Sequence, residues 1–413
     1  MNLQEEGMFQ MKATKDIRLT NITKLARVIT GGAPMTRREL AQNVDLSLMT
    51  VTTLVDQLLE MGIITLLPVK NDSKNGRKAD LLSPNINDRR ILILDLSDYN
   101  FLCDTVDLCL NTRGPVLRHQ YRREQSYAEN LTEFLGQVKA SFSAAPAPYQ
   151  LLGISAVVPG PFFPQSGSVM NKRIPELCSL DLKSILQKSF PGQIVYIEED
   201  VKFAAYSLLG DSRGLEEKIV SYIYMGEGVG GGIINNLQIV LGRNSVAGDV
   251  GQLMANKTQN YEQMLSIRRL YRELCGQETD AGAADILDSL AALQRREPAK
   301  VAACLENVYG DLANLLYNVI WLLNPHLIVI DCAYLLRLAP DSEAKVEAAL
   351  RNVLKQNESY LPEIRFLQSG RNGIYCGGGL KVLELYIKNQ LYSDAKTGEE
   401  DPNEKKKTQI SNP

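Results

Sequence analysis

The first 84 residues contain three segments with a helical repeat of apolar positions, followed by two short apolar runs. ITKLARVI at 22–29 and TRRELAQNV at 36–44 each place their apolar side chains on one helical face. The third segment begins at Ser47 and ends at Gly62, and its predicted buried face consists of Val51, Leu54, Val55, Leu58 and Leu59. The runs IITLLPV and ADLLS flank a polar stretch and predict a two-stranded hairpin. Three helices and a hairpin together predict a winged helix-turn-helix domain over residues 15–84.

Capping residues support two of these helix starts. Thr36 precedes the second helix, and Glu39 follows three residues later, which is the spacing of a capping box. Ser47 can cap the third helix in the same way, because its hydroxyl can accept a hydrogen bond from a free backbone N–H of the first turn.

Two regions in which strands alternate with helices follow the first domain. RILILDLSDYNFLCDTVDLCL predicts an antiparallel meander, and KIVSYIYMG opens a second series around a glycine-rich loop. Two such α/β halves enclose a cleft, which is where ligands bind in this architecture. The predicted boundaries are 90–200 for a first lobe completed by a C-terminal helix at 377–392, 201–376 for a second lobe, and 394–413 for a disordered polar tail.

Composition narrows the possible chemistry. The chain has 413 residues, is 45% hydrophobic, and contains no run of about 18 apolar residues that could span a membrane. Its N-terminal stretch lacks the apolar core of a secretion signal, so a cytoplasmic location is expected. Seven cysteines occur singly and predict reduced thiols. The only two histidines, His119 and His326, exclude histidine-rich metal sites.

The net charge of −3 conceals a mildly basic N-terminal domain. Residues 1–90 contain 13 Lys and Arg against 10 Asp and Glu, whereas the remainder contains 32 against 38. A basic domain attached to an acidic body favours contact with a polyanion such as double-stranded DNA.

The predicted third helix would present its exposed N-terminal residues to base edges in the major groove. Arginines at the start of the preceding helix and basic residues at the hairpin tip would hold backbone phosphates. The candidate DNA contacts are Arg37, Arg38, Ser47, Leu48, Met49, Thr52, Thr53, Lys74, Arg77 and Lys78, with Lys70 beside them. A small protein-interaction module with a solvated basic loop is the alternative.

Several motifs, in order along the chain, resemble the ROK family of repressors, open reading frames and sugar kinases. The head motif LAQNVDLSLMTVTTLVDQLLEMGII is similar to the branch that carries a winged helix-turn-helix. The body motifs are GISAVVPG, EEDVKFAAYSLLG, YMGEGVGGGII, AGDVGQ and LNPHLIVI. The resemblance covers residues 21–391 and implies an α/β, two-lobed, actin-like ATPase fold of the ribonuclease H-like, sugar kinase, Hsp70 and actin type.

The chain departs from the family pattern where the kinases bind nucleotide. The resemblance implies a glycine-rich phosphate turn after Asp95, but Ser97 and Asp98 replace its two glycines. The paired glycines after a late strand are replaced by Asp331 and Cys332. Acidic side chains repel phosphates, and non-glycine residues prevent close backbone approach. ATP is therefore not expected as a cofactor.

The glycine-rich loop is retained in a modified form. Glu227 stands where the kinases prefer a small hydroxyl residue, and the loop glycines are Gly226, Gly228, Gly230, Gly231 and Gly232. These glycines can cradle a phosphate, or they can serve a tight hairpin and close lobe packing, which is the interpretation we favour.

The sugar-binding half of the predicted cleft retains more of the family pattern than the nucleotide-binding half. By resemblance, the candidate effector-binding residues are Pro159, Gly160, Asn171, Glu199, Asp200, Asp249 and Gln252. Asp200 matches the aspartate that acts as the general base in the family's kinases. An N-cap role at the start of a helix would also explain an aspartate at this position. The family's structural zinc is not expected, because Gln252 replaces its histidine and no cysteine lies between Cys178 and Cys275.

Three functions remain open. The favoured one is a cytoplasmic transcription regulator, a repressor of carbohydrate uptake or metabolism genes, that binds a DNA operator as a homodimer or tetramer and responds to a sugar or sugar derivative. The second is a sugar kinase with an added DNA-binding head, in which Asp200 is the general base and the glycine loop holds phosphate. The third is a scaffold that docks a transport protein.

Overall fold

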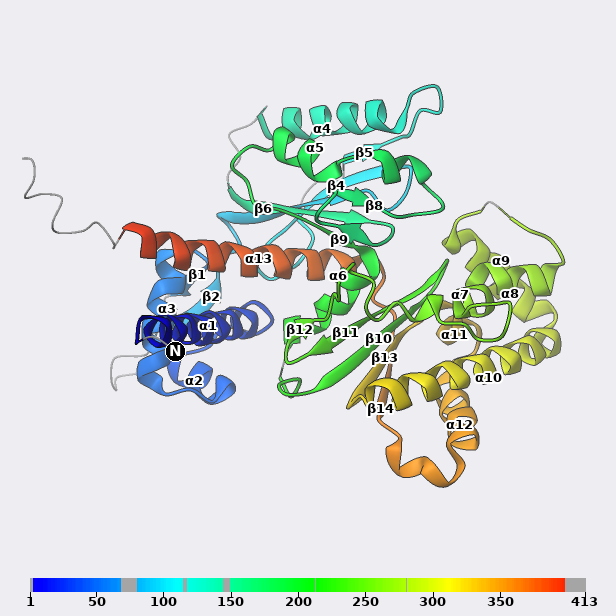
Figure 1. The fold of residues 1–413 in the computed structure, drawn as a ribbon. Helices are drawn as coiled ribbons and strands as arrows, with labels where there is room; N and C mark the ends of the chain where they lie inside the picture. The colour runs from blue at the N-terminus through cyan, green and yellow to red at the C-terminus, as the bar shows by residue number, and fades with distance from the viewer. Residues whose placement is uncertain are drawn as a thin grey trace, which may run out of the picture.

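The computed structural model describes residues 3–67, 80–113, 117–143, 149–211, 213–279 and 281–397. They form a helical head and two α/β lobes, and the long C-terminal helix lies beside the head and the first lobe (Figure 1). None of the helices in these ranges is both long and apolar enough to cross a membrane.

The head has the predicted three helices and hairpin. Its elements are α1 (Leu3–Thr30), α2 (Arg37–Val44), α3 (Leu48–Glu60), β1 (Ile64–Leu67) and β2 (Leu81–Pro84). β1 and β2 pair antiparallel. An isolated antiparallel β-bridge between Met35 and Leu82 adds a third short segment to this hairpin, which is the wing. The Thr36–Glu39 capping box and the Ser47 cap are both present.

Two details of the head differ from the sequence prediction. Helix α1 begins well before the predicted segment at 22–29, because no proline interrupts the preceding residues. Leu59 is only partly buried, whereas the other four predicted residues of the α3 face are in the core with Ile22, Leu25 and Leu40.

The first lobe is built on a five-stranded mixed sheet in the order β5-β4-β3-β6-β9. β3, β4 and β5 form the predicted antiparallel meander, and β6 and β9 extend the sheet parallel to β3. The strands are β3 (Arg89–Asp95), β4 (Phe101–Val106), β5 (Leu117–His119), β6 (Gln150–Val158) and β9 (Val195–Glu199), with α4 (Tyr127–Ser143), α5 (Leu182–Ser189) and the short pair β7 (Phe162–Phe163) and β8 (Ser168–Val169).

The second lobe repeats this topology in the order β12-β11-β10-β13-β14, again a meander followed by two parallel strands. The strands are β10 (Ile219–Met225), β11 (Val229–Asn235), β12 (Gln238–Ile239), β13 (Leu327–Asp331) and β14 (Glu363–Leu367). The helices are α7 (Tyr261–Leu265), α8 (Ile267–Cys275), α9 (Ala283–Arg296), α10 (Pro298–Leu323), α11 (Ala333–Leu338) and α12 (Ser342–Leu354).

One predicted helix of this lobe is divided. The apolar repeat of YEQMLSIRRLYREL at 261–274 predicts one continuous helix, but Ser266 adopts an extended conformation that ends α7. Its hydroxyl then accepts a hydrogen bond from the backbone N–H of Arg269 and caps α8.

Two helices connect the lobes. α6 (Asp200–Ser207) follows β9, and α13 (Gly370–Thr397) packs on α6, β3 and β6. The helix predicted at 377–392 therefore starts earlier and ends later, and residues 394–397 of the predicted tail are helical. The rest of that tail lies outside the described residues.

Candidate functional sites

The N-terminal half of α3 presents an exposed surface. Met49 is 83% exposed and Leu48 is 52% exposed, although both are apolar, and Ser47 and Thr53 are exposed beside them. The hydroxyls of Thr52 and Thr53 donate to the carbonyls of Leu48 and Met49, and their oxygens remain able to accept hydrogen bonds. The structure thus brings these five candidate residues onto one surface.

The candidate phosphate contacts differ in availability. Arg38 is exposed, whereas Arg37 is partly buried and pairs with Asp56 of α3 at 2.6 Å. Arg37 therefore ties α2 to α3, and Arg38 is the better phosphate candidate of the two. Lys70, Lys74, Arg77 and Lys78 lie outside the described residues.

Arg27 of α1 joins the head to the body. Its side chain is only 3% exposed and forms an ion pair with Glu384 of α13. The same guanidinium donates to the Tyr206 hydroxyl of α6 at 3.5 Å and to the Leu237 carbonyl at 3.4 Å. Tyr206 also donates to Glu384. One buried cation on the first helix of the head thus contacts both connecting helices and the second lobe.

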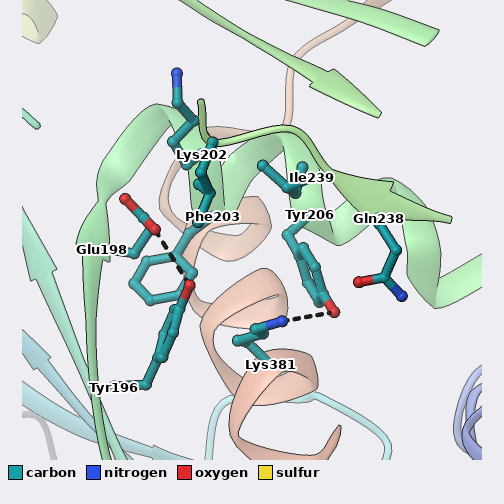
Figure 2. Close-up of a pocket in the computed structure, with 9 residues that line it drawn as sticks. Tyr196, Glu198, Lys202, Phe203, Tyr206, Gln238, Ile239 and Lys381 are labelled. Carbon is teal, nitrogen blue, oxygen red and sulfur yellow. Dashed lines mark hydrogen bonds between the residues drawn. The ribbon is translucent and has the colours of Figure 1, made fainter. Parts of the chain in front are cut away.

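A small cavity of about 40 Å³ lies next to this junction. It is lined by Tyr196, Glu198, Lys202, Phe203, Tyr206, Gln238, Ile239, Leu241 and Lys381 (Figure 2). Tyr196 donates to Glu198 at 3.2 Å, and Lys381 donates to Tyr206 at 3.5 Å. Glu198 lines this cavity, and Glu199 points away from it because successive strand residues point to opposite faces.

The cleft that the sequence predicts would lie where the parallel strands of both lobes end. Asp95 ends β3, Pro159 and Gly160 follow β6, and Glu199 ends β9, all at one edge of the first sheet. Asp331 ends β13 in the second lobe. The carboxyl ends of parallel strands are the usual position for a ligand in such sheets.

Asp95, which precedes the altered phosphate turn, and Asp331, which replaces a glycine of the later turn, are buried and hydrogen-bonded within the protein. Asp95 accepts from the Ser97 N–H at 3.1 Å and from the Tyr375 hydroxyl at 3.0 Å. Asp331 accepts from the Tyr222 hydroxyl at 2.6 Å and from the N–H and hydroxyl of Ser369. Ser369 immediately precedes α13 and Tyr375 lies in its second turn, so both carboxylates hold the same end of that helix.

The glycine loop is the turn of the β10–β11 hairpin. Met225 pairs with Val229, and the Gly226 N–H donates to the Gly228 carbonyl at 2.9 Å. Gly230, Gly231 and Gly232 lie in β11, where a Cβ on Gly231 would meet the Gly248 carbonyl oxygen at 2.4 Å. Gly231 therefore allows close packing of backbones, whereas Gly230 and Gly232 face the side chains of Val201 and Ala205.

Glu227, in the same turn, bridges the two lobes. Its carboxylate pairs with Arg173 of the first lobe at 3.1 Å and with Arg268 of α8. Arg173 also donates to the Ser97 carbonyl at 3.4 Å. A protein carboxylate and its two arginines thus lie beside the altered phosphate turn.

Asn171 holds the Pro159–Gly160 turn. Its side-chain amide donates to the Pro159 carbonyl at 2.7 Å, and its oxygen accepts from the N–H groups of Arg173 and Ile174. A Cβ on Gly160 would lie 2.4 Å from the Met170 carbonyl oxygen, so only glycine fits. The structure therefore brings these three candidates together, with most of the Asn171 amide already engaged.

The remaining effector candidates converge around Lys202, a fully buried cation of α6. Lys202 Nζ donates to the Gly231 carbonyl at 2.6 Å and lies 3.8 Å from Glu199 Oε2. The pKa of Glu199 is raised to about 8: burial is the largest cause, Lys202 lowers the pKa, and Asp200 and Asp249 raise it. Burial likewise raises the pKa of Asp200 to about 6 and also raises that of Asp249.

Asp200 is not the N-cap of α6. Glu199 occupies that position, and Asp200 is the first helical residue, whose Oδ1 accepts from the Val201 N–H at 2.7 Å. The alternative explanation of Asp200 as an N-cap is therefore wrong.

Gln252 is exposed and is held by Glu262 and Asn260. Its amide donates to Glu262 at 2.9 Å, and its oxygen accepts from Asn260 at 3.3 Å. Burial is the largest cause of the raised pKa of Asp249, and the negative charge of Glu262 also raises it. Among the described residues, no group of three or more His, Cys, Asp or Glu is placed to hold a metal ion.

Sequence reasoning missed Lys202, Glu262 and Arg173. Lys202 had a usable signal, because it lies three residues after Glu199 on a predicted helix and can pair with it. Glu262 and Arg173 had none, because only the tertiary fold brings them to the cleft.

The raised pKa of Glu199 predicts a pH effect on stability. Its folded value of about 8 exceeds the usual 4.5, so the folded chain binds more protons than the unfolded chain between these values, and stability falls as the pH rises. We expect Glu199→Gln to increase the free energy of unfolding by about 1–2 kcal/mol at pH 8.5 and to change it little at pH 4.5. Urea unfolding at both pH values measures this. The control Glu343→Gln, on the exposed face of α12, should show no pH-dependent difference, and equal effects of Glu199→Gln at both pH values would contradict the assignment.

The fold and the sites define a class: a two-lobed α/β protein with a winged helix-turn-helix head. A profile described as ROK family matches residues 105–360, and one described as winged helix-turn-helix DNA-binding matches residues 27–65. The chain belongs to the ROK family.

Curated relatives include repressors. The chain is 30% identical to a xylose repressor of Caldicellulosiruptor bescii over 58% of this chain and 60% of that protein. It is 23% identical to the Escherichia coli DNA-binding transcriptional dual regulator NagC over 60% of each chain. The matches therefore span about 60% of the length of these relatives.

Solved structures show the same fold. A ROK family transcriptional regulator, described as a homologue of the E. coli MLC protein, matches with a TM-score of 0.66 and 18% identity over 90% of this chain and 97% of that one. A ROK hexokinase from Thermus thermophilus matches with a TM-score of 0.56 and 19% identity over 73% of this chain and 99% of that one. The two-lobed fold is thus shared with a kinase as well as a regulator.

Proposed function

We propose that this chain is a cytoplasmic, sequence-specific DNA-binding repressor of carbohydrate uptake or metabolism genes, whose cleft senses a sugar-type effector. The observation that carries the proposal is the joining of a winged head, through the buried Arg27, to lobes in which Asp98 and Asp331 replace glycines of the family's phosphate turns. The relatives named as xylose and N-acetylglucosamine repressors support it.

The proposed mechanism couples lobe closure to the head. An effector between the lobes would change their separation, and Arg27 contacts elements of both. A homodimer or tetramer on a palindromic operator would then convert a change in head spacing into a change in DNA affinity. The coupling free energy between effector binding and DNA binding is typically about 1–3 kcal/mol in allosteric proteins.

DNA binding is tested by selecting duplexes from genomic fragments and measuring gel shifts. We expect Met49→Ala to weaken binding to the selected site by about tenfold, because Met49 can contact a thymine methyl group. Arg38→Ala should weaken binding to all duplexes. It should also reduce the slope of log K against log salt concentration by about one, because one phosphate contact is lost. The matched control is Arg365→Ala, an exposed arginine on β14 in the far lobe. The absence of any preferred duplex would overturn the proposal.

The competing kinase function is tested by coupled ADP release with a panel of hexoses and pentoses. Asp98 and Asp331, which replace glycines of the phosphate turns, predict no turnover, because a triphosphate would meet like charges there. Turnover that disappears in Asp200→Asn would instead establish the kinase.

A further inference from the structure

Glu227 shares its carboxylate between two arginines that belong to different lobes. Its Oε1 atom pairs with Arg268 of α8 in the same lobe, and its Oε2 atom lies 3.1 Å from Arg173 Nη1 in the first lobe. Arg268 also donates to the Thr279 carbonyl at 2.8 Å, and Arg173 donates to the Ser97 carbonyl at 3.4 Å. Each arginine is therefore anchored within its own lobe. We call this group, Arg173, Glu227 and Arg268, the Glu227 bridge.

The backbone of the glycine loop fixes the direction of the Glu227 side chain. The Gly226 N–H donates to the Gly228 carbonyl at 2.9 Å and closes the turn. The Gly226 carbonyl accepts from the Ile267 N–H at 2.8 Å, at the first residue of α8. Because Arg268 is the next residue of α8, the turn and this arginine are held together, and the second carboxylate oxygen is presented to Arg173 of the first lobe.

The Glu227 bridge lies where the sequence departs from the kinase pattern. The turn after Asp95 carries Ser97 and Asp98 in place of glycines, and Glu227 replaces a small hydroxyl residue in the glycine loop. By resemblance, both turns would contact phosphate in a kinase, one from each lobe. In this chain Arg173 contacts both turns, through the Ser97 carbonyl and the Glu227 carboxylate. The two altered turns are thus joined by the chain's own charged side chains.

We propose that the Glu227 bridge holds the two lobes together without nucleotide, as an internal substitute for a bound phosphate. Arg173 and Glu227 join the lobes away from the connecting helices α6 and α13. The pair therefore opposes a separation of the lobes that the two helices alone would permit. This inference rests on the proposed function and deepens it, because it assigns the restraint on the lobe movement by which an effector would act.

The exposure of the three side chains makes this restraint reversible. Arg173 is 50% exposed, Arg268 is 33% exposed and Glu227 is 27% exposed, so water and salt compete with both pairs. An ion pair of this kind shifts an equilibrium by up to about fivefold, and salt weakens it. The Glu227 bridge can thus bias the position of the lobes without fixing it, whereas the buried pair of Arg27 and Glu384 fixes the head.

The test is a distance measurement by double electron–electron resonance between nitroxide labels on two native cysteines. Cys178 of the first lobe and Cys275 at the end of α8 in the second lobe are both exposed. The half-buried Cys109 and Cys376 are replaced by alanine in every sample. Labelled chain is diluted with unlabelled chain, so that distances between protomers do not contribute. We expect the population of longer distances to grow between low salt and about 1 M salt, where the Debye length is about 3 Å.

Variants identify the bridge as the cause. Glu227→Gln and Arg173→Gln should each raise the ratio of longer to shorter distances by about two- to fivefold at low salt. Glu227→Gln should also remove most of the salt dependence. The double variant should have no larger effect than Glu227→Gln alone, because both substitutions break the same pair.

The matched control is Arg337→Gln, which breaks a pair of similar exposure with Asp288 inside the second lobe and should change no distance. Circular dichroism verifies that each variant folds, and Arg173→Gln carries the test if Glu227→Gln does not. Unchanged distances in the folded variant, or a double variant whose effect is the sum of the single effects, would overturn the proposal.

Gel shifts separate this inference from the proposed function. We expect Glu227→Gln to weaken binding to the selected operator by about two- to fivefold, because the heads would match the half-site spacing in a smaller fraction of molecules. Arg337→Gln should leave this affinity unchanged. If the distances change but no duplex is selected, the Glu227 bridge stands and the repressor proposal fails. If an operator is selected but Glu227→Gln leaves the distances unchanged, the bridge inference alone fails.

Discussion

Arg27→Ala is expected to lower the free energy of unfolding by about 3–5 kcal/mol, because it removes one partner of a buried ion pair. The Arg27 side chain is 3% exposed and that of Glu384 is 11% exposed, so little water can solvate the carboxylate left behind. Tyr206, which donates to Glu384, would also lose its contact with the guanidinium. The measurement is the midpoint and slope of urea unfolding followed by circular dichroism.

Two controls make this result specific. Lys24→Ala removes a more exposed pair with Glu216, one helical turn away on α1, and should cost no more than about 1 kcal/mol. The double variant Arg27→Met with Glu384→Leu removes both charges and should recover much of the loss. A loss for Arg27→Ala no larger than that for Lys24→Ala would contradict the role of Arg27 as the junction.

Helix α13 links the cleft to this junction. Asp95 and Asp331 hold residues at its start, and Glu384, farther along the same helix, holds Arg27 of the head. Arg371, near the start of the helix, also pairs with Asp95 at 3.6 Å, and the 14 residues from Arg371 to Glu384 span about 20 Å of helix. A shift of one lobe against the other can therefore reach the head through one rigid element, without a separate chain of contacts.

Local patterns explain why so much of the fold was predictable. The Thr36–Glu39 capping box, the Ser47 cap and the β3–β5 meander depend on residues close in sequence, and each is present as expected. The division of α7 from α8 was not predicted, because an apolar repeat continues across Ser266 and only its extended backbone conformation breaks the helix.

The sites were less predictable, because their contacts join distant parts of the chain. Arg27 and Glu384 are 357 positions apart, and the α1 pattern gives Arg27 no feature that separates it from a solvated arginine. Glu227 was identifiable as an unusual residue in the glycine loop, but its bridge from Arg173 to Arg268 depends on the relative position of the lobes. The resemblance located the carboxylates of the cleft, and the fold supplied Lys202 and Glu262.

The crossing of α6 and α13 depends on a glycine. A Cβ on Gly377 would lie 1.8 Å from the carbonyl oxygen of Phe203 and 3.0 Å from the backbone nitrogen of Ser207. These are backbone atoms of the facing helix, so no rotation of a side chain can relieve the clash. The two helices can accommodate a larger residue only by moving apart.

Gly377→Ala is therefore expected to destabilise the chain by about 3 kcal/mol, at the upper end of the usual cost of overpacking. Gly310→Ala is the matched control, because Gly310 lies within α10 and a Cβ there meets no atom within 4 Å. The same substitution should there stabilise the chain by about 0.4–1 kcal/mol, since alanine favours a helix interior. Urea unfolding of both variants tests whether the two substitutions change the free energy of unfolding in opposite directions. If Gly377→Ala also stabilised the chain, the close contact of α6 and α13 would be wrong, and with it the link from the cleft to the head.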